Sequence, residues 1–543
     1  MTIEMQRFAC AALLALTACG NDPSPATPDA GVSDAGQSDA GGTGGDAATT
    51  AQVMTDHGPI IGHASGAITA FLGIPYAAPP VGALRWAATA DHAAWTAPLD
   101  AAALGPACSQ TAGGLGQSGP YSEDCLTLNV WAPSRTATAH APVMVFIHGG
   151  VFIHGSSNQP GYDGAALAAA GSVVVTLNYR LGVLGFLAHP ALTAEDAHHS
   201  SGNAGLLDQQ AALRWVHANI AALGGDPANV TIFGESAGSM SVCAHIVSPL
   251  AAGLFHRALG ESGTCLLFAT PLHTTAGGRP SAEAAGLGVA QALGCDTASD
   301  VLACMRAKST DEVLAASPSV EDIAGLASQP NVDGYVLPEP PAQAFAAGRV
   351  NRIDSYLGGT NLDEATLFSA MKTLATEADY EAAITALVPT HASDAIALYN
   401  PANYPSFKDA YNAALTDLVF VCPTRVQARR LIDVGTTAYA YELTWLTAFG
   451  AAAKLGVYHG SELPFVFGNL TVRSGMSAAD RAFSNQVIGA WTRFAATGDP
   501  NGGSAPAWPP YAATTAPYLD LGDPLQAKTG LHHATCDVVE QWH

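Results

Sequence analysis

The chain is 543 residues long, with 48% hydrophobic and only 12% charged residues. This composition supplies enough apolar side chains for a large buried core, and it excludes global disorder, a collagen and a coiled coil. Acidic residues outnumber basic ones by 45 to 21, which gives a formal net charge of −24. A nucleic-acid-binding protein needs a basic surface, so no nucleic-acid partner is expected.

The N-terminus resembles a bacterial lipoprotein signal. Residues 8–18 form an apolar stretch that is too short for a bilayer, which takes about 20 residues. A buried helix would also explain the stretch, but it runs into Leu-Thr-Ala-Cys at 16–19. In lipoproteins the cysteine of this pattern is lipidated and becomes the mature N-terminus.

The resemblance implies a signal peptide over residues 1–18 and lipidation at Cys19. The protein would then be exported and anchored to the cell envelope, with the outer membrane expected, on its periplasmic or its outer side. The anchor would be its only contact with the membrane.

A low-complexity segment follows the leader. Residues 20–50 are rich in Asp, Ala, Gly, Ser and Pro and contain no aromatic residue. Such a segment cannot bury enough apolar surface to offset the entropy of ordering it. We therefore predict a flexible acidic tether over residues 19–50. No second such linker follows, so residues 51–543 are predicted to form one large domain.

Two apolar, β-branched runs predict buried strands in the first half of the chain. One covers residues 143–147 and is followed by His-Gly-Gly at 148–150; the other covers residues 172–177. Residues 208–223 predict an amphipathic helix that ends at Gly224.

A strand, a tight turn and a helix are predicted around Ser236. Residues 230–233 are apolar and β-branched, Gly-Glu-Ser-Ala-Gly follows at 234–238, and a helix-compatible stretch comes next. Small residues allow the turn to hold its central residue in strained dihedral angles. The turn also sets the Ser236 hydroxyl at the positive end of a helix, where a developing anion is stabilised. This is the pattern of a nucleophile elbow.

A further helix is predicted to start at Ser477, where Asp480 completes a capping-box-like pair. Gly498 and Pro500 end it. Its apolar residues on one face are Phe483, Val487, Trp491 and Phe494. The alternation of strands and helices predicts an α/β fold in which helices connect parallel strands.

The cysteines fit an exported protein. Cys10 lies within the leader and Cys19 is the lipidation candidate, so eight of the ten remain, an even number that permits disulfides. Spacing alone suggests the pairs 108–125 and 295–304 and leaves the other four cysteines unassigned. No C-x-x-C or H-E-x-x-H motif is present, so no metal site is expected. The histidine doublets at 198–199 and 532–533 are interpreted as solvated loop residues.

Several segments in order resemble the type-B carboxylesterase and cholinesterase family, which has the α/β-hydrolase fold. The resemblance covers about residues 51–543. It rests on FLGIPYAAPP at 71–80, SEDCLTLNV at 122–130, HGGVF at 148–152, NYRLGVLGFL at 178–187, GNAGLLDQQAALRWV at 202–216, the elbow, GVYHGSELPFVFG at 456–468 and WTRFAATGDP at 491–500. It implies a single large domain with a mostly parallel central sheet flanked by helices.

The resemblance also implies a catalytic triad. Ser236 would be the nucleophile, Glu364 the acid and His459 the general base, in the chain order of an α/β-hydrolase. Residue chemistry alone would not select His459 among 18 histidines, nor Glu364 over the neighbouring Asp363.

An oxyanion hole is implied at the backbone N–H groups of Gly150, Val151 and Ala237. Val151 departs from the family, which often has a third glycine there. The backbone donor is retained, but the β-branched side chain narrows the space beside it. Ala365 also departs, because a glycine commonly follows the acid.

The family pattern implies the disulfides Cys108–Cys125, Cys295–Cys304 and Cys422–Cys536. This leaves Cys243 and Cys265, and we hypothesise a fourth bridge between them. The resemblance further suggests the ion pairs Arg85–Glu123 and Arg180–Asp208.

The reaction implied is ester hydrolysis through an acyl-enzyme, with no cofactor and with a small-molecule ester as substrate. Glu235 is expected to tune the local field rather than to attack. Cholinesterase-like members hold a quaternary ammonium with a tryptophan in the first disulfide loop; here the loop contains Tyr121 and no tryptophan, which argues against choline esters. Short, medium or aryl esters are favoured. The alternatives are a long-chain lipase and a non-catalytic adhesion or binding protein of the same fold. The oligomeric state is not predicted.

Overall fold

The computed structural model describes residues 50–111, 120–134, 140–275, 280–317, 329–470, 476–503 and 505–542. The predicted signal peptide, Cys19 and nearly all of the predicted tether lie outside the described residues. Within these ranges, no helix has both the length and the apolar character needed to cross a membrane.

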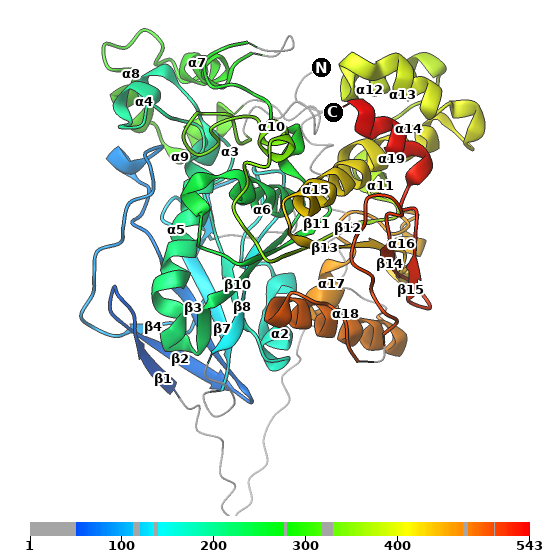
Figure 1. Ribbon diagram of the computed structural model, residues 1–543. Coiled ribbons are helices and arrows are strands. Elements are labelled where there is room, and N and C mark those ends of the chain that lie inside the picture. Colours follow the sequence, from blue (N-terminus) through cyan, green and yellow to red (C-terminus); the bar gives the residue numbers. More distant parts are fainter. Residues whose placement is uncertain are drawn as a thin grey trace, which may run out of the picture.

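One mixed sheet of 13 strands organises the described chain (Figure 1). Its centre is parallel, in the spatial order β9 (Val173–Leu177), β8 (Ala141–Ile147), β10 (Gly225–Glu235), β11 (Arg257–Glu261), β12 (Ser355–Asn361), β13 (Thr437–Leu443) and β14 (Tyr518–Leu521). Antiparallel strands extend the β9 side as β7 (Thr127–Pro133), β3 (Ile68–Pro75), β2 (Pro59–Ser65) and β1 (Thr50–Met54), and β15 (Gln526–Lys528) extends the other. The short β4 (Leu99–Asp100) pairs with β2, and β5 (Ala107–Cys108) pairs with β6 (Tyr121–Ser122) as a separate ribbon. The predicted parallel centre is confirmed; the antiparallel margin was not predicted.

The central strands are buried on both faces, as continuous apolar runs require. In β8, Val143, Val145 and Ile147 belong to one apolar cluster. Met144 and Phe146, which alternate with them, belong to the other. The first cluster includes residues of α5 (Ala204–Asn219), α6 (Ala237–Val247) and α15 (Cys422–Asp433), and the second those of α2 (Ala165–Ala169), α17 (Leu463–Phe467) and α18 (Ala478–Thr497). The sheet is therefore enclosed between two helical layers.

The elements predicted individually lie where expected. The three predicted strands fall within β8, β9 and β10. The helix predicted over 208–223 is α5 followed by the 3-10 turn η3 (Ile220–Leu223), which ends at Gly224 with φ 92°. At the start of α18, Ser477 and Asp480 form a complete capping box, and the four predicted apolar residues of this helix are buried.

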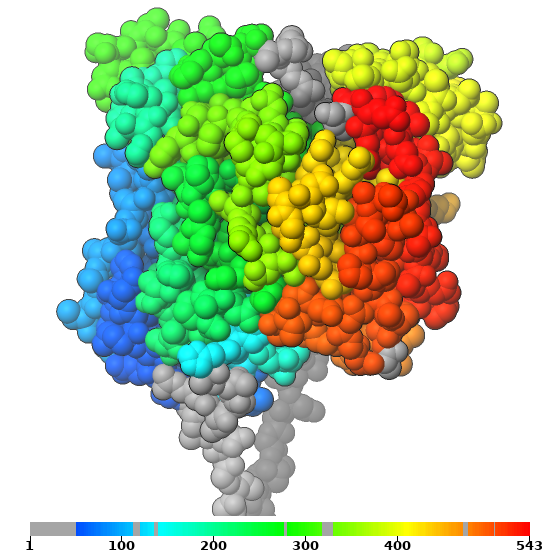
Figure 2. All heavy atoms as spheres, viewed as in Figure 1, coloured from blue at the N-terminus to red at the C-terminus, as the bar shows by residue number. Residues whose placement is uncertain are grey.

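Shorter helices fill the periphery of the sheet. They are α3 (Gly182–Phe186), α4 (Pro190–Glu195), α7 (Ala282–Ala292), α8 (Val301–Arg306), α9 (Thr310–Ala315), α10 (Pro341–Ala346), α11 (Ala365–Ser369), α12 (Glu377–Leu387), α13 (Ala392–Leu398), α14 (Phe407–Leu415), α16 (Ala448–Ala452) and α19 (His533–Val539). A π-helical turn, η9 (Thr416–Val421), joins α14 directly to α15. Figure 2 shows the C-terminal residues (red) seated against the segment around residue 400 (yellow) and against α15.

Four disulfides link cysteines of the described chain. They are Cys108–Cys125, Cys243–Cys265, Cys295–Cys304 and Cys422–Cys536. The second joins α6 to the turn η5 (Cys265–Leu267), so it fixes the helix that follows Ser236.

Both suggested ion pairs are present. Arg85 and Glu123 form two hydrogen bonds of 2.8 and 2.5 Å. Arg180 and Asp208 form two of 2.8 and 2.7 Å between almost fully buried side chains.

Candidate active site

The candidate residues collect at the carboxyl ends of the parallel strands. In the sheet register Gly234 of β10 lies opposite Ile147 of β8, and Glu235 lies opposite Glu261 of β11. The segments that follow these strands therefore meet at one edge of the sheet, which is where ligands bind in open α/β folds.

Ser236 occupies a strained turn between β10 and α6. Its φ of 57° and ψ of −122° lie in a region that non-glycine residues rarely adopt. The turn also brings backbone segments into close contact. A Cβ added to Gly238 would lie 1.9 Å from the carbonyl oxygen of Ile147, and a Cβ added to Gly234 would lie 2.6 Å from the carbonyl carbon of Gly238. These glycines are thus required sterically, and they present the half-buried Ser236 at the first turn of α6.

The N–H groups predicted to form the oxyanion hole are unpaired in the described part of the chain. Among the described residues, the N–H groups of Gly150, Val151 and Ala237 form no hydrogen bonds. The loop after β8 passes close to the elbow, since a Cβ on Gly149 would lie 3.0 Å from the Cβ of Ser236. This arrangement supplies backbone donors beside the hydroxyl.

The loop after β8 is itself strained and braced. Val151 has a φ of 59°, an outlier for a β-branched residue. Gln110, next to the first disulfide, donates to the carbonyl of Gly155 at 2.8 Å and accepts from its N–H at 3.0 Å. Tyr179 stacks on His148 and donates to its carbonyl at 2.9 Å. These contacts hold the loop in its strained conformation.

Glu364 and His459 form a buried pair. His459 Nδ1 lies 2.6 Å from Glu364 Oε2, and Glu364 Oε1 accepts the N–H of Asn361 at 2.7 Å. The neighbouring Asp363 instead accepts the N–H of Val457 at 2.8 Å. The structure therefore distinguishes the two acids: Glu364 contacts the imidazole, and Asp363 braces the segment that carries it.

The other side of His459 faces Glu235 and two aromatic rings. His459 Nε2 lies 3.1 Å from Glu235 Oε1, while the rings of Phe368 and Phe420 lie 4.8 and 5.0 Å from the imidazole. Within the described chain, no hydrogen bond joins Ser236 to His459. The structure thus brings Glu364 and His459 into contact. Ser236 directly follows Glu235, whose carboxyl group faces the other ring nitrogen of His459.

Two further buried glutamates, not singled out from the sequence, complete the site. Glu261 accepts a hydrogen bond from Trp491 at 2.6 Å, and Glu462 accepts one from Asn361 at 2.5 Å. Like Glu235 and Glu364, they lie at or just after strand ends or on the His459 loop. The signal in the sequence is a glutamate in each of Gly-Glu-Ser, Gly-Glu-Ser and His-Gly-Ser-Glu.

Burial raises the pKa values of Glu235, Glu261 and Glu462. Desolvation raises the pKa of Glu235 to about 7, and that of Glu462 to about 8 with a further contribution from the negative charges of Glu235 and Glu364. Burial would lower the pKa of His459, but the nearby Glu235 and Glu364 carboxylates raise it to about 9. The site therefore favours an imidazolium between two carboxylates.

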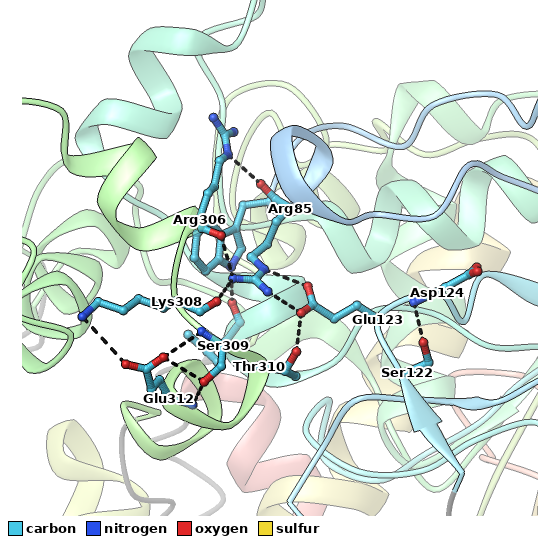
Figure 3. A network of polar contacts seen from close by, with 11 residues as sticks. Arg85, Ser122, Glu123, Asp124, Arg306, Lys308, Ser309, Thr310 and Glu312 are labelled. Carbon is cyan, nitrogen blue, oxygen red and sulfur yellow. Dashed lines mark hydrogen bonds and ion pairs between the residues drawn. The ribbon is translucent and has the colours of Figure 1, made fainter.

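A separate hollow of about 650 Å³ lies beside the first disulfide loop, lined by Gln110, Tyr121, Glu123, Thr310 and Leu314, among others. None of the three triad candidates lines it. Figure 3 shows the polar network around two of its lining residues, Glu123 and Thr310: Arg85 bridges Glu123 to the carbonyls of Arg306 and Lys308, and Thr310 donates to Glu123. This network ties the first disulfide loop to α8 and α9.

No cluster of three or more His, Cys, Asp or Glu residues in the described ranges is arranged to hold a metal ion.

The interpretation of His532 and His533 as solvated loop residues is wrong. His533 is the first residue of α19, and its Nε2 is buried. His532 is not a solvated loop residue, because its ring lies between Asp417 (2.5 Å) and Glu442 (2.8 Å). Burial opposes its charge, but hydrogen bonds to both carboxylates raise its pKa to about 10. The sequence could not show this, because the partners are 115 and 90 residues away.

The parallel sheet, with its elbow and buried histidine at the strand ends, defines an α/β-hydrolase, and comparison with known proteins gives the family. Residues 49–539 match the model of the carboxylesterase family. The chain belongs to this family and is a carboxylic ester hydrolase.

Three relatives support this assignment. The chain is 37% identical over 487 residues to para-nitrobenzyl esterase of Bacillus subtilis (strain 168), which covers 86% of this chain and 94% of the relative. It is 35% identical over 489 residues to fumonisin B1 esterase of Sphingopyxis macrogoltabida, covering 86% and 87%. It is 36% identical over 510 residues to carboxylesterase 1D of Mus musculus, covering 85% and 86%. A solved structure of PNB esterase superposes with a TM-score of 0.78 at 34% identity, covering 90% of this chain and all of that one.

Proposed function

We propose that the protein is a serine carboxylesterase with Ser236 as nucleophile, His459 as general base and Glu364 as the acid that orients it. The observation that carries the proposal is the strained Ser236 turn beside three unpaired N–H groups, with a buried histidine–glutamate pair on the same edge of the sheet.

In the proposed first half-reaction, Ser236 Oγ attacks the ester carbonyl carbon while His459 Nε2 takes its proton. Glu364 holds the Nδ1–H and stabilises the imidazolium. The N–H groups of Gly150, Val151 and Ala237 bind the oxyanion, and each such donor typically contributes about 2.7–4 kcal/mol to the transition state. The imidazolium then gives its proton to the departing alcohol, which leaves an acyl-enzyme.

Water completes the cycle in the second half-reaction. His459 removes a proton from the water, whose oxygen attacks the acyl carbon, and the acid product leaves as Ser236 is reprotonated. Glu235, 3.1 Å from Nε2, is placed to stabilise the imidazolium in both halves.

Short, medium or aryl esters are the proposed substrates. Val151 lies on the loop proposed to supply two of the oxyanion donors, and its β-branched side chain would limit the bulk of the group bound beside the carbonyl. Among the relatives, a para-nitrobenzyl esterase supports the choice of aromatic esters as test compounds.

The test is hydrolysis of p-nitrophenyl esters from acetate to palmitate by the full-length protein and by Ser236→Ala. We expect activity that is highest with short chains and is lost in the variant, together with covalent labelling of Ser236 by a fluorophosphonate. Highest activity with long chains would instead indicate a lipase. Activity retained in Ser236→Ala would refute the serine assignment.

Ser262 provides a matched control. Like Ser236 it follows a glutamate at a strand end and has a positive φ, here 55°, but it is fully buried. Ser262→Ala should therefore keep the fluorophosphonate label. Equal loss of label in both variants would show that the assay reports folding rather than the nucleophile.

We also propose that the protein is lipid-anchored at Cys19 on the cell envelope, on the basis of the lipoprotein-like signal. In the native host, wild type should incorporate radiolabelled palmitate and sediment with membranes, whereas Cys19→Ala should do neither. Unlabelled wild type, or a variant that stays labelled, would contradict the anchor.

A further inference from the structure

The π-helical turn η9 contacts His459 and the residue that follows Glu364, so it touches the chain at both members of the buried acid–base pair. Its Phe420 ring lies 5.0 Å from the imidazole of His459. Its Thr416 hydroxyl accepts the N–H of Ala365, the residue after Glu364, at 3.2 Å. All six residues of the turn are buried. A π-helical turn is rare and is often found at functional sites, so this one invites a functional explanation.

The C-terminal segment holds this turn at both ends. Near its start, the carboxylate of Asp417 lies 2.5 Å from His532 Nδ1 and accepts a hydrogen bond of 3.0 Å from the hydroxyl of Tyr399. Directly after its end, Cys422 is bonded to Cys536, at the centre of α19.

His532 is built into its position. It adopts a left-handed conformation, with φ 45° and ψ 38°, directly before α19. Its second ring nitrogen binds Glu442 of β13 at 2.8 Å, and the side chains of Asp417 and Glu442 are each only 7% exposed. A cationic imidazole between two buried carboxylates is attracted to both and offsets one of their two negative charges. Loss of the imidazole would leave Asp417 buried with Tyr399 as its remaining side-chain partner.

We propose that His532 is a positioning residue for the acid–base pair and acts through the π-helical turn. This inference rests on the proposed function. His532 fixes Asp417 and thereby the turn; the turn then keeps Phe420 against the imidazole and Thr416 against the backbone that follows Glu364. A displacement of about 1 Å in such a framework can reduce the rate of an enzyme by about a hundredfold without any change in the reacting groups.

The test compares His532→Gln with the matched control His533→Gln. The control makes the same chemical change one residue away, at a ring whose Nε2 forms no hydrogen bond within the described chain. Active sites are counted by fluorophosphonate titration so that kcat refers to folded enzyme. For His532→Gln we expect kcat per site to fall by about tenfold to a hundredfold with KM within about twofold, and for His533→Gln we expect neither change.

A spectroscopic measurement separates positioning from stability. The far-downfield proton resonance of the His459 Nδ1–H, hydrogen-bonded to Glu364, should move or broaden in His532→Gln and stay in place in His533→Gln. It does not depend on Ser236 and is read in the Ser236→Ala background as well. If Ser236→Ala retained activity, the proposed function would fail while this resonance still tested the positioning role of His532.

Two results would overturn the proposal: a His532→Gln enzyme with kcat per site within about twofold of wild type, or an unchanged His459 resonance. If His532→Gln does not fold, Phe420→Leu replaces it, because this change leaves the His532 bridges intact and removes the aromatic contacts of Phe420 with His459 and Phe368. Phe420→Leu must then lower kcat and shift the resonance; unchanged values for both refute transmission through the turn.

Discussion

Replacing Glu235 by Gln should shift the pH dependence of the esterase. Glu235 Oε1 lies 3.1 Å from His459 Nε2, so at an effective dielectric constant of about 20 its full charge stabilises the imidazolium by about 5 kcal/mol. Burial raises the pKa of Glu235 to about 7, so this carboxyl is almost fully ionised near pH 9, where His459 titrates. The stabilisation of about 5 kcal/mol, at about 1.36 kcal/mol per pH unit, corresponds to a shift of up to about four pH units.

The sign follows from the proposed role of His459 as a base. Only the neutral imidazole accepts a proton, so kcat/KM rises as the pH rises through the pKa of His459. Removing the Glu235 charge lowers this pKa and moves the acid limb of the profile to lower pH. At high pH the variant should be slower than wild type, because its imidazole is a weaker base.

The assay is kcat/KM for p-nitrophenyl acetate between about pH 5 and pH 10, in wild type, Glu235→Gln and Glu261→Gln. Glu261 is equally buried, but it accepts a hydrogen bond from Trp491 and makes none with His459, so its variant should keep the wild-type limb. An unchanged limb in Glu235→Gln, or an equal shift in both variants, would refute the electrostatic reasoning.

Three further predictions concern the stability of the fold and the size of the acyl group that the site accepts. Asp208→Asn should lower the free energy of unfolding by about 3–5 kcal/mol in urea titrations, because it leaves the guanidinium of Arg180 buried without its counter-charge; a loss below about 1 kcal/mol would contradict this. Val151→Gly should relieve a left-handed strain of about 1–2 kcal/mol and raise kcat/KM for branched acyl esters relative to acetate, which a substrate series would reveal as a changed ratio. Ser477→Ala should lower the free energy of unfolding by about 1 kcal/mol, because it removes the cap of α18 while leaving activity unchanged.

The predictable parts of the fold are those with strong local signals. The runs at 143–147 and 230–233 are apolar and β-branched and end in glycines, so tertiary packing and local preference agree there. The cap of α18 is a pattern within four residues, and it was correct in detail. The antiparallel strands β1, β2, β3 and β7 were not predicted, because they lack such uniform runs.

The site could be predicted only where the sequence is contiguous. The Ser236 turn is local, whereas Glu364 and Asp363 have the same chemistry at adjacent positions, and only the packing of the 456–459 segment distinguishes them. Glu261 and His532 acquire their roles from partners 230 and at least 90 residues away, distances over which no local pattern extends.

The spread of the site along the chain also has a kinetic consequence. The elbow follows β10 and the proposed oxyanion loop follows β8, whereas the contact between Glu364 and His459 joins residues 95 apart beyond β12. Contacts so distant in sequence form slowly, because long loops must close first. A chain that has assembled only its first half therefore carries a shaped serine turn with no base to activate it. The rate at which esterase activity returns during refolding should consequently report the rate at which the second half of the sheet assembles. Partly folded chains should be unable to hydrolyse esters.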